Sequence, residues 1–244
     1  MVGRASALLA LVAALAAYDS LHGRLWRASS IWWDVLFISV VVIPASFALV
    51  WLVLPLRKAR GLLPPAVALG VLTYAFHVAG WHTPENLTKL FAVSLAGFWF
   101  LGYFEEASWL VLVALIIPWV DAVSVWRGPT REIVKHHGHV FTALSYAFPL
   151  PGISGAARLG IPELLFFAVF LAGAARFALR TRWTWLALTA SFGVTIAISV
   201  WLDLSGLPAL PGVALGFLVP NADLLWARLR RARRPKPPAA HGQP

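Results

Sequence analysis

Eight long apolar runs dominate this 244-residue chain and leave little sequence with which to build a water-soluble domain. A helix that spans a bilayer needs about 20 mostly apolar residues, and these runs are continuous, without the alternation that marks strands. The first run, which follows Arg4 and becomes rich in alanine, also fits a signal peptide. We predict an all-α, polytopic transmembrane helix bundle of about eight spans, at residues 5–20, 31–54, 62–81, 87–104, 106–126, 160–179, 183–202 and 206–226.

The composition supports a membrane protein. Hydrophobic residues make up 60% of the chain and charged residues only 12%, whereas a soluble domain carries roughly 25% charged residues. Cysteine is absent, which excludes disulfides and cysteine-based zinc sites. The net charge is +10, but the basic residues lie between the apolar runs or in the C-terminal tail. That distribution predicts contacts with membrane lipids and not with nucleic acid.

The chain divides into three regions by the same pattern. We expect a four-span membrane region at 1–104, a second membrane region at 105–226 that contains the connection 127–159, and a basic, proline-rich disordered tail at 227–244. With eight spans, thirteen Lys and Arg lie on the side of the C-terminus and seven on the other. The excess predicts a cytoplasmic C-terminus, and the abundance of Arg and Ala indicates a bacterial plasma membrane.

Two acidic residues lie inside apolar runs, where ionisable side chains are costly and often functional. Asp121 precedes Arg127 by six residues, and Glu163 follows Arg158 by five. At 1.5 Å per residue, both carboxyl groups lie roughly 8 Å inside the same boundary, on consecutive antiparallel spans. Facing acids in a low dielectric tend to share one proton, so one can activate water as a base while the other serves as an acid.

The remaining ionisable residues have simpler interpretations. Asp203 is expected to be a loop or capping residue and is the reserve candidate for the site, and His77 is expected to hydrogen-bond a neighbouring helix. A solvated loop accounts better than a metal site for the three histidines His136, His137 and His139. Interfacial positions, solvated or paired with Arg, are predicted for Asp34, Glu85, Glu105, Glu106 and Asp223.

Prolines gather around the two acids. Pro118 lies one turn before Asp121, Pro162 directly precedes Glu163, and Pro208 and Pro211 flank Ala209–Leu210. Proline removes a backbone donor, and loosened helices at membrane depth are tolerated where they line protein or water. The sequence thus predicts three helix breaks around the acids, as a site that admits water requires.

Three motifs, in order, resemble the presenilin and signal peptide peptidase family of intramembrane aspartyl proteases. WVDAVSVWRGP resembles the first catalytic segment, with Val120 where the family has Tyr. RLGIPELLFFAVF resembles the second, with Glu163 in place of Asp and Pro162 in place of Gly. GLPALPGVALGF contains the Pro-Ala-Leu motif as Pro208, Ala209 and Leu210. The resemblance covers roughly residues 112–226 and implies a presenilin-like fold there, although the family has nine spans.

The resemblance implies a protease that cleaves transmembrane helices or signal-peptide remnants without a metal or organic cofactor. Asp121 and Glu163 would be catalytic, Pro208, Ala209 and Leu210 would bind the substrate, and the partners would be transmembrane peptides or proteins. Two alternatives stay open. Glu163 and Pro162 favour a catalytically silent relative that binds membrane helices, and a proton-coupled transporter could use the two acids as a relay.

Overall fold

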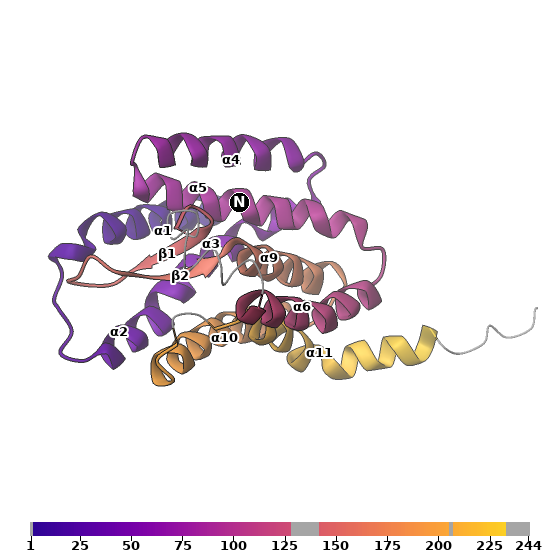
Figure 1. Ribbon diagram of the computed structural model, residues 1–244. Coiled ribbons are helices and arrows are strands. Elements are labelled where there is room, and N and C mark those ends of the chain that lie inside the picture. The colour runs from indigo at the N-terminus through magenta and orange to yellow at the C-terminus, as the bar shows by residue number, and fades with distance from the viewer. Residues whose placement is uncertain (1, 128–141, 205–206, 233–244) are drawn as a thin grey trace, which may run out of the picture.

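The computed structural model describes residues 2–127, 142–204 and 207–232, which form eight helical segments and one β-hairpin (Figure 1). Five of the segments are long and apolar enough to cross a membrane, and the chain is therefore a multi-pass helical membrane protein. The segments are α1 (Val2–Leu21), α2 (Ile31–Phe37) continued through η2 (Ile38–Val42) into α3 (Ile43–Val53), α4 (Leu63–Val78), α5 (His82–Phe100), α6 (Ala107–Arg127), α9 (Ile161–Arg176), α10 (Thr181–Trp201) and α11 (Leu210–Ala232).

Each of the eight predicted runs coincides with one helical segment. The five that satisfy the length and hydropathy needed for a span are α1, the continuous α2–α3 segment, α6, α10 and α11, and α4 is a shorter apolar helix. Several boundaries were wrong. Helix α5 begins at His82 and not at 87, and α11 begins at Leu210 and not at 206. Helix α11 continues to Ala232, so residues 227–232 of the predicted tail are helical.

The prolines act differently from the prediction. Pro118 lies inside α6, which continues unbroken to Arg127, so the expected break there is absent from the described helix. Pro162 lies in the first turn of α9, and Pro208 and Pro211 flank the start of α11. Proline at the start of a helix costs little, because the first N–H groups have no intrahelical partner. These prolines therefore set where α9 and α11 begin.

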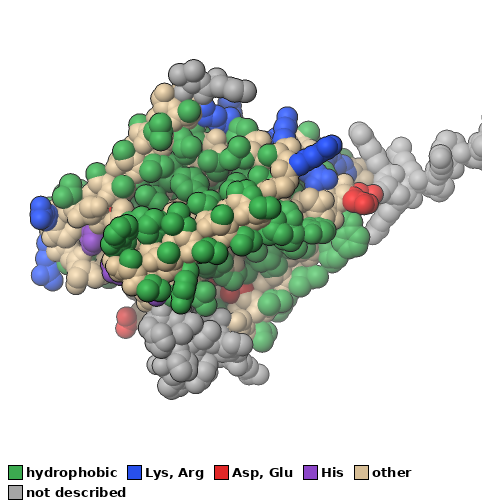
Figure 2. Space-filling view, turned by 90° about the horizontal axis from the view of Figure 1, so that it is seen from above, with side chains coloured by type: hydrophobic (Ala, Val, Ile, Leu, Met, Phe, Trp, Pro, Cys, Tyr) green, Lys and Arg blue, Asp and Glu red, His purple; other side chains and the backbone are tan. Residues whose placement is uncertain are grey.

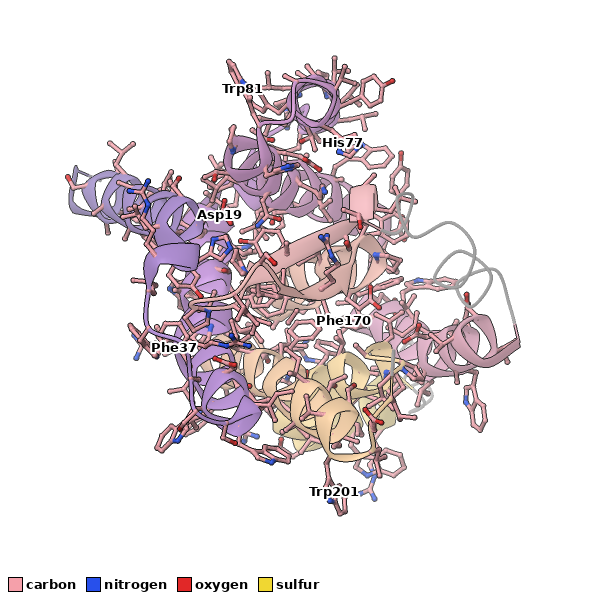
Figure 3. The ribbon with its side chains drawn as sticks, turned by 60° about the vertical axis from the view of Figure 1, so that its left-hand side comes forward. Asp19, Phe37, His77, Trp81, Phe170 and Trp201 are labelled. Atoms are coloured by element: carbon pink, nitrogen blue, oxygen red, sulfur yellow. The ribbon has the colours of Figure 1, made fainter. Side chains whose placement is uncertain are left out.

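Helix α9 forms the centre of the bundle. The side chains of its residues 167–172 are fully buried, and α5, α10 and α11 all pack around it. Phe170, which lies in the interior in Figure 3, stacks on Phe217 of α11 with ring centroids 4.7 Å apart. Gly97 allows α5 to approach closely, since a Cβ there would lie 2.9 Å from the Cβ of Ala168. Tight packing thus fixes the position of the helix that carries Glu163.

Apolar side chains cover much of the outside as well. The view in Figure 2, taken from the side of α4, shows a broad hydrophobic surface with Lys and Arg toward its periphery. Trp81 and Trp201 project from opposite sides of the molecule in Figure 3, and their side chains are 59% and 73% exposed. An apolar exterior with exposed tryptophans suits a lipid environment.

A two-stranded antiparallel hairpin corrects the expectation of a purely helical chain. Strand β1 (Ser145–Pro149) pairs with β2 (Ala156–Gly160), and Ser145 is opposite Gly160. The side chains of Tyr146 and Phe148 are buried on the core, where the Tyr146 hydroxyl lies 3.2 Å from Ser46 Oγ. Strand β2 leads directly into α9, so the hairpin holds the first turn of α9 in place.

Candidate active site

Asp121 links α6 to the start of α11. Its side chain is buried, and Oδ2 accepts a hydrogen bond of 2.9 Å from the backbone N–H of Leu210, while the N–H of Ala209 also bonds the carboxylate. The first N–H groups of a helix lack intrahelical partners, and an anion beside them is stabilised by the helix dipole. Asp121 therefore caps α11, and the first and third sequence motifs meet although they lie 89 residues apart.

Glu163 lies in the first turn of α9, after the N-cap residue Gly160. Its carboxyl group folds back against Gly160, where an added Cβ would lie 2.5 Å from Oε2, and it accepts a hydrogen bond from its own backbone N–H. A simple helix-capping role would use such a contact. However, Oε2 is buried and has no hydrogen-bond partner among the described residues. A buried polar atom of this kind calls for a proton, a water molecule or a ligand.

The two carboxyl groups interact. The charge of Asp121 on α6 is near enough to act on the carboxyl group of Glu163 on α9. Two carboxylates in a low dielectric cannot both ionise easily, whereas the N-termini of α9 and α11 favour one negative charge. The arrangement can hold one negative charge and one proton, which general acid–base catalysis on water requires.

The buried Pro208, Ala209 and Leu210 lie beside Asp121, at the start of α11. Asp203, the reserve candidate, is exposed in the turn after α10, with φ of 50°. Its position confirms the loop prediction. Within the described residues, no three His, Asp or Glu side chains gather in a metal-binding arrangement, and His136, His137 and His139 lie outside those residues.

Most of the other acids lie where the sequence indicated. Asp223 forms a bidentate, exposed ion pair with Arg180 at 2.7 Å. Glu105 and Glu106 are also exposed, and Asp34 is half-buried. His77 of α4 confirms its predicted role, since its Nδ1 lies 3.2 Å from Glu85 Oε1 on α5.

Glu85 contradicts its sequence interpretation. It was expected at an interfacial position, solvated or paired with Arg, yet it is buried and is paired with Lys89, which is buried as well. Lys89 Nζ donates to Glu85 Oε1 at 3.0 Å and to the carbonyl oxygen of Ser145 at 2.9 Å. The signal in the sequence was their i, i+4 spacing, which places a Glu and a Lys side by side on one helix face.

Side chains from α5 and α1 cover the outer edge of β1. Asn86 Nδ2 donates to the carbonyl of Ala147 at 2.7 Å, and the N–H of Ala147 donates to Asn86 Oδ1 at 2.9 Å. The Tyr18 hydroxyl donates to the carbonyl of Pro149 at 2.5 Å. The backbone N–H and carbonyl of Ala147 both point to Asn86, so Ala147 and Arg158 form a pair of the antiparallel hairpin that exchanges no hydrogen bonds. The N–H and carbonyl of Arg158 therefore point away from β1. Among described residues, no hydrogen bond occupies that outer edge of β2.

A groove of about 580 Å³ runs between α10 and α11, away from the acids. Its walls are apolar apart from Arg180, and neither Asp121 nor Glu163 lines it. The groove faces outward between two spans, so its surface suits lipid and offers no chemistry.

Comparisons of the chain with family models, with curated proteins and with solved structures give no match. The likeness to presenilin and signal peptide peptidase therefore rests on the three ordered motifs. Any assignment of function has to be argued from the carboxyl pair and its surroundings.

Proposed function

We propose that the chain is an intramembrane aspartyl-type protease, which hydrolyses transmembrane helices or signal-peptide remnants. The observation that carries the proposal is that Asp121, which caps the start of α11, lies near enough for its charge to act on the carboxyl group of Glu163. A buried acid pair supplies a base and an acid within one site, and it needs neither metal nor organic cofactor.

The surroundings favour different roles for the two acids. Asp121 accepts hydrogen bonds from backbone N–H groups at the start of α11. These bonds stabilise the negative charge of its carboxylate, so Asp121 is the base. Glu163, whose Oε2 has no partner among described residues, carries the proton and is the acid. Asp121 removes a proton from water as the water oxygen bonds to the peptide carbon. Glu163 protonates the carbonyl oxygen, which gives a tetrahedral diol. The C–N bond then breaks as Asp121 gives its proton to the nitrogen and one hydroxyl of the diol returns a proton to Glu163. The products are a carboxylic acid and an amine.

A substrate must be extended where it is cut, because the peptide groups of a helix are shielded by their own hydrogen bonds. The outer edge of β2 carries unused backbone groups close to Glu163, since Gly160 ends β2 and contacts the Glu163 carboxyl group. An unwound segment could pair with that edge by strand addition. Pro208, Ala209 and Leu210 would border the same segment from the start of α11. The substrates that fit are therefore apolar helices with a segment that unwinds easily.

The test is cleavage of a labelled transmembrane peptide by the purified protein in liposomes. Asp121→Asn and Glu163→Gln keep side-chain volume and remove the acids, so each should lower the rate by at least ~100-fold. Glu106→Gln is the control, because Glu106 is an exposed acid near the start of α6 and should not affect cleavage. Unchanged cleavage in both acid variants would refute the proposal.

One observation favours the alternative of a silent helix-binding protein. Glu163 folds back onto its own N–H and Gly160, a contact that serves helix capping. In that case the wild type captures transmembrane peptides but does not cut them. Capture would persist in Asp121→Asn, and Glu163→Asp would be the variant in which cleavage could appear.

A further inference from the structure

Side chains from α1 and α5 form hydrogen bonds with the backbone on the outer edge of β1, in the place that a third strand would take. Three alternate residues, Ser145, Ala147 and Pro149, have their outward backbone groups bonded by Lys89, Asn86 and Tyr18. Asn86 bonds both the N–H and the carbonyl of Ala147, as a neighbouring strand would. Pro149 has no N–H and so leaves no donor to satisfy. The edge is thereby closed to any further strand.

We propose that Asn86 and Lys89 are positioning residues of the active site, which fix the hairpin against α5 and thereby fix Glu163. This inference rests on the proposed function for its catalytic consequence. The two residues lie three positions apart on α5, so they share one face of the helix and reach alternate residues of the same strand.

Packing alone does not account for the charges at this contact. Lys89 and Glu85 are 4% and 6% exposed, and burying an ion pair gives little or no gain over apolar residues of similar size. The carbonyl of Ser145 explains why Lys89 and Glu85 lie here. Lys89 donates to that carbonyl, and Glu85 neutralises the charge of Lys89. His77 of α4 holds Glu85 from the other side. The network thus presents one fixed donor to the start of β1.

The hairpin transmits this position to α9. Register pairs β1 with β2 along their full length, and the N–H of Ile161, the first residue of α9, donates to the carbonyl of Leu144 at 3.2 Å. Gly160, the last residue of β2 before α9, contacts the carboxyl group of Glu163. A shift of β1 away from α5 therefore displaces the first turn of α9. Misplacement of a catalytic group by about 1 Å can cost ~100-fold in rate.

The experiment measures amide hydrogen exchange and peptide cleavage in Asn86→Leu. The exchange rate should rise about tenfold or more at the N–H of Ala147, which loses its bond to Asn86. It should also rise at the N–H of Ile161, which shows whether the first turn of α9 has loosened. The turnover number should fall by ~100-fold, with KM within about threefold of wild type. Thr88→Val is the matched control, because Thr88 lies on α5 but bonds Thr73 of α4. Its exchange and turnover should match those of the wild type.

The outcomes separate the two proposals. Unchanged exchange at Ile161 in Asn86→Leu overturns the positioning role, even if Ala147 exchanges faster. If the wild type cleaves no peptide, the proposed function fails while the exchange data still decide the positioning role. Asn86→Asp covers the case in which Asn86→Leu does not fold. Asp keeps the acceptor for the Ala147 N–H, but it places a carboxylate oxygen against the Ala147 carbonyl oxygen in place of the donor. Exchange at Ile161 should therefore also rise, and no rise overturns the positioning role.

Discussion

Replacing Gly160 with alanine adds one methyl group directly against the Glu163 carboxyl. The new Cβ would lie 2.5 Å from Oε2, whereas ordinary contact begins at about 3.4 Å, so the carboxyl group must retreat by about 0.9 Å. The backbone gives no reason for strain, because Gly160 has φ of −68° and ψ of 161°, which alanine adopts freely. The effect of the substitution is therefore confined to the position of one side chain.

A displacement near 1 Å corresponds to ~100-fold in rate, or about 2.7 kcal/mol of transition-state stabilisation. The assay compares initial cleavage rates of wild type, Gly160→Ala and Gly155→Ala in liposomes. Gly155 is the control because it lies in the same hairpin, and its added Cβ would meet mainly the flexible ends of Leu150 and Ile153, 3.3 and 3.6 Å away. Thermal denaturation should be nearly the same for all three proteins.

A double variant tests whether residues 160 and 163 act on each other. Glu163→Asp shortens the side chain and withdraws it from the added methyl group, so the losses in Gly160→Ala/Glu163→Asp should be less than additive. Wild-type cleavage by Gly160→Ala would refute the claim that the Glu163 carboxyl must occupy the observed position. Strictly additive losses would show that the two residues do not act on each other.

Three further outcomes are expected. Lys89→Met leaves Glu85 buried without its cation and should destabilise the protein by about 3–5 kcal/mol in chemical denaturation, and adding Glu85→Gln should recover much of the loss. Single cysteines at Arg24 and Arg228 of this cysteine-free chain should react with impermeant reagents from opposite sides of intact cells, the second from the cytoplasm; labelling from one side would refute the orientation. The cleavage rate should be bell-shaped in pH, because the acid pair must hold one proton, and a flat profile would contradict a shared proton.

The helices were predictable because a membrane imposes one strong rule, that about 20 apolar residues form a span. The equal depth expected for Asp121 and Glu163 came from counting residues to Arg127 and Arg158, and it stays a prediction. The bond from Leu210 to Asp121 could not be read from spacing, since a contact across 89 residues depends on how α6 and α11 pack. Only the resemblance of the Pro-Ala-Leu motif indicated that these segments belong together.

The hairpin escaped prediction because its strands are only five residues each and lie in a connection between two predicted spans. Its signal is the alternation of Tyr146 and Phe148, which is too short to separate from chance. Asn86 was overlooked for a different reason. An amide near the start of a helix has many ordinary roles, and its value here depends on the backbone of Ala147, which the sequence does not locate.

The shortness of α9 bears on how water reaches the bilayer interior. Its 16 residues span about 24 Å, roughly 6 Å less than the hydrocarbon thickness of a typical membrane. Because α5, α10 and α11 surround α9, protein and not lipid meets the missing length, and β2 continues the chain from the start of the helix. In a bilayer of that thickness, an α9 with Arg176 at one surface would begin about one helical turn below the other surface. The unused backbone groups on the outer edge of β2 would then bring water to the level of Glu163.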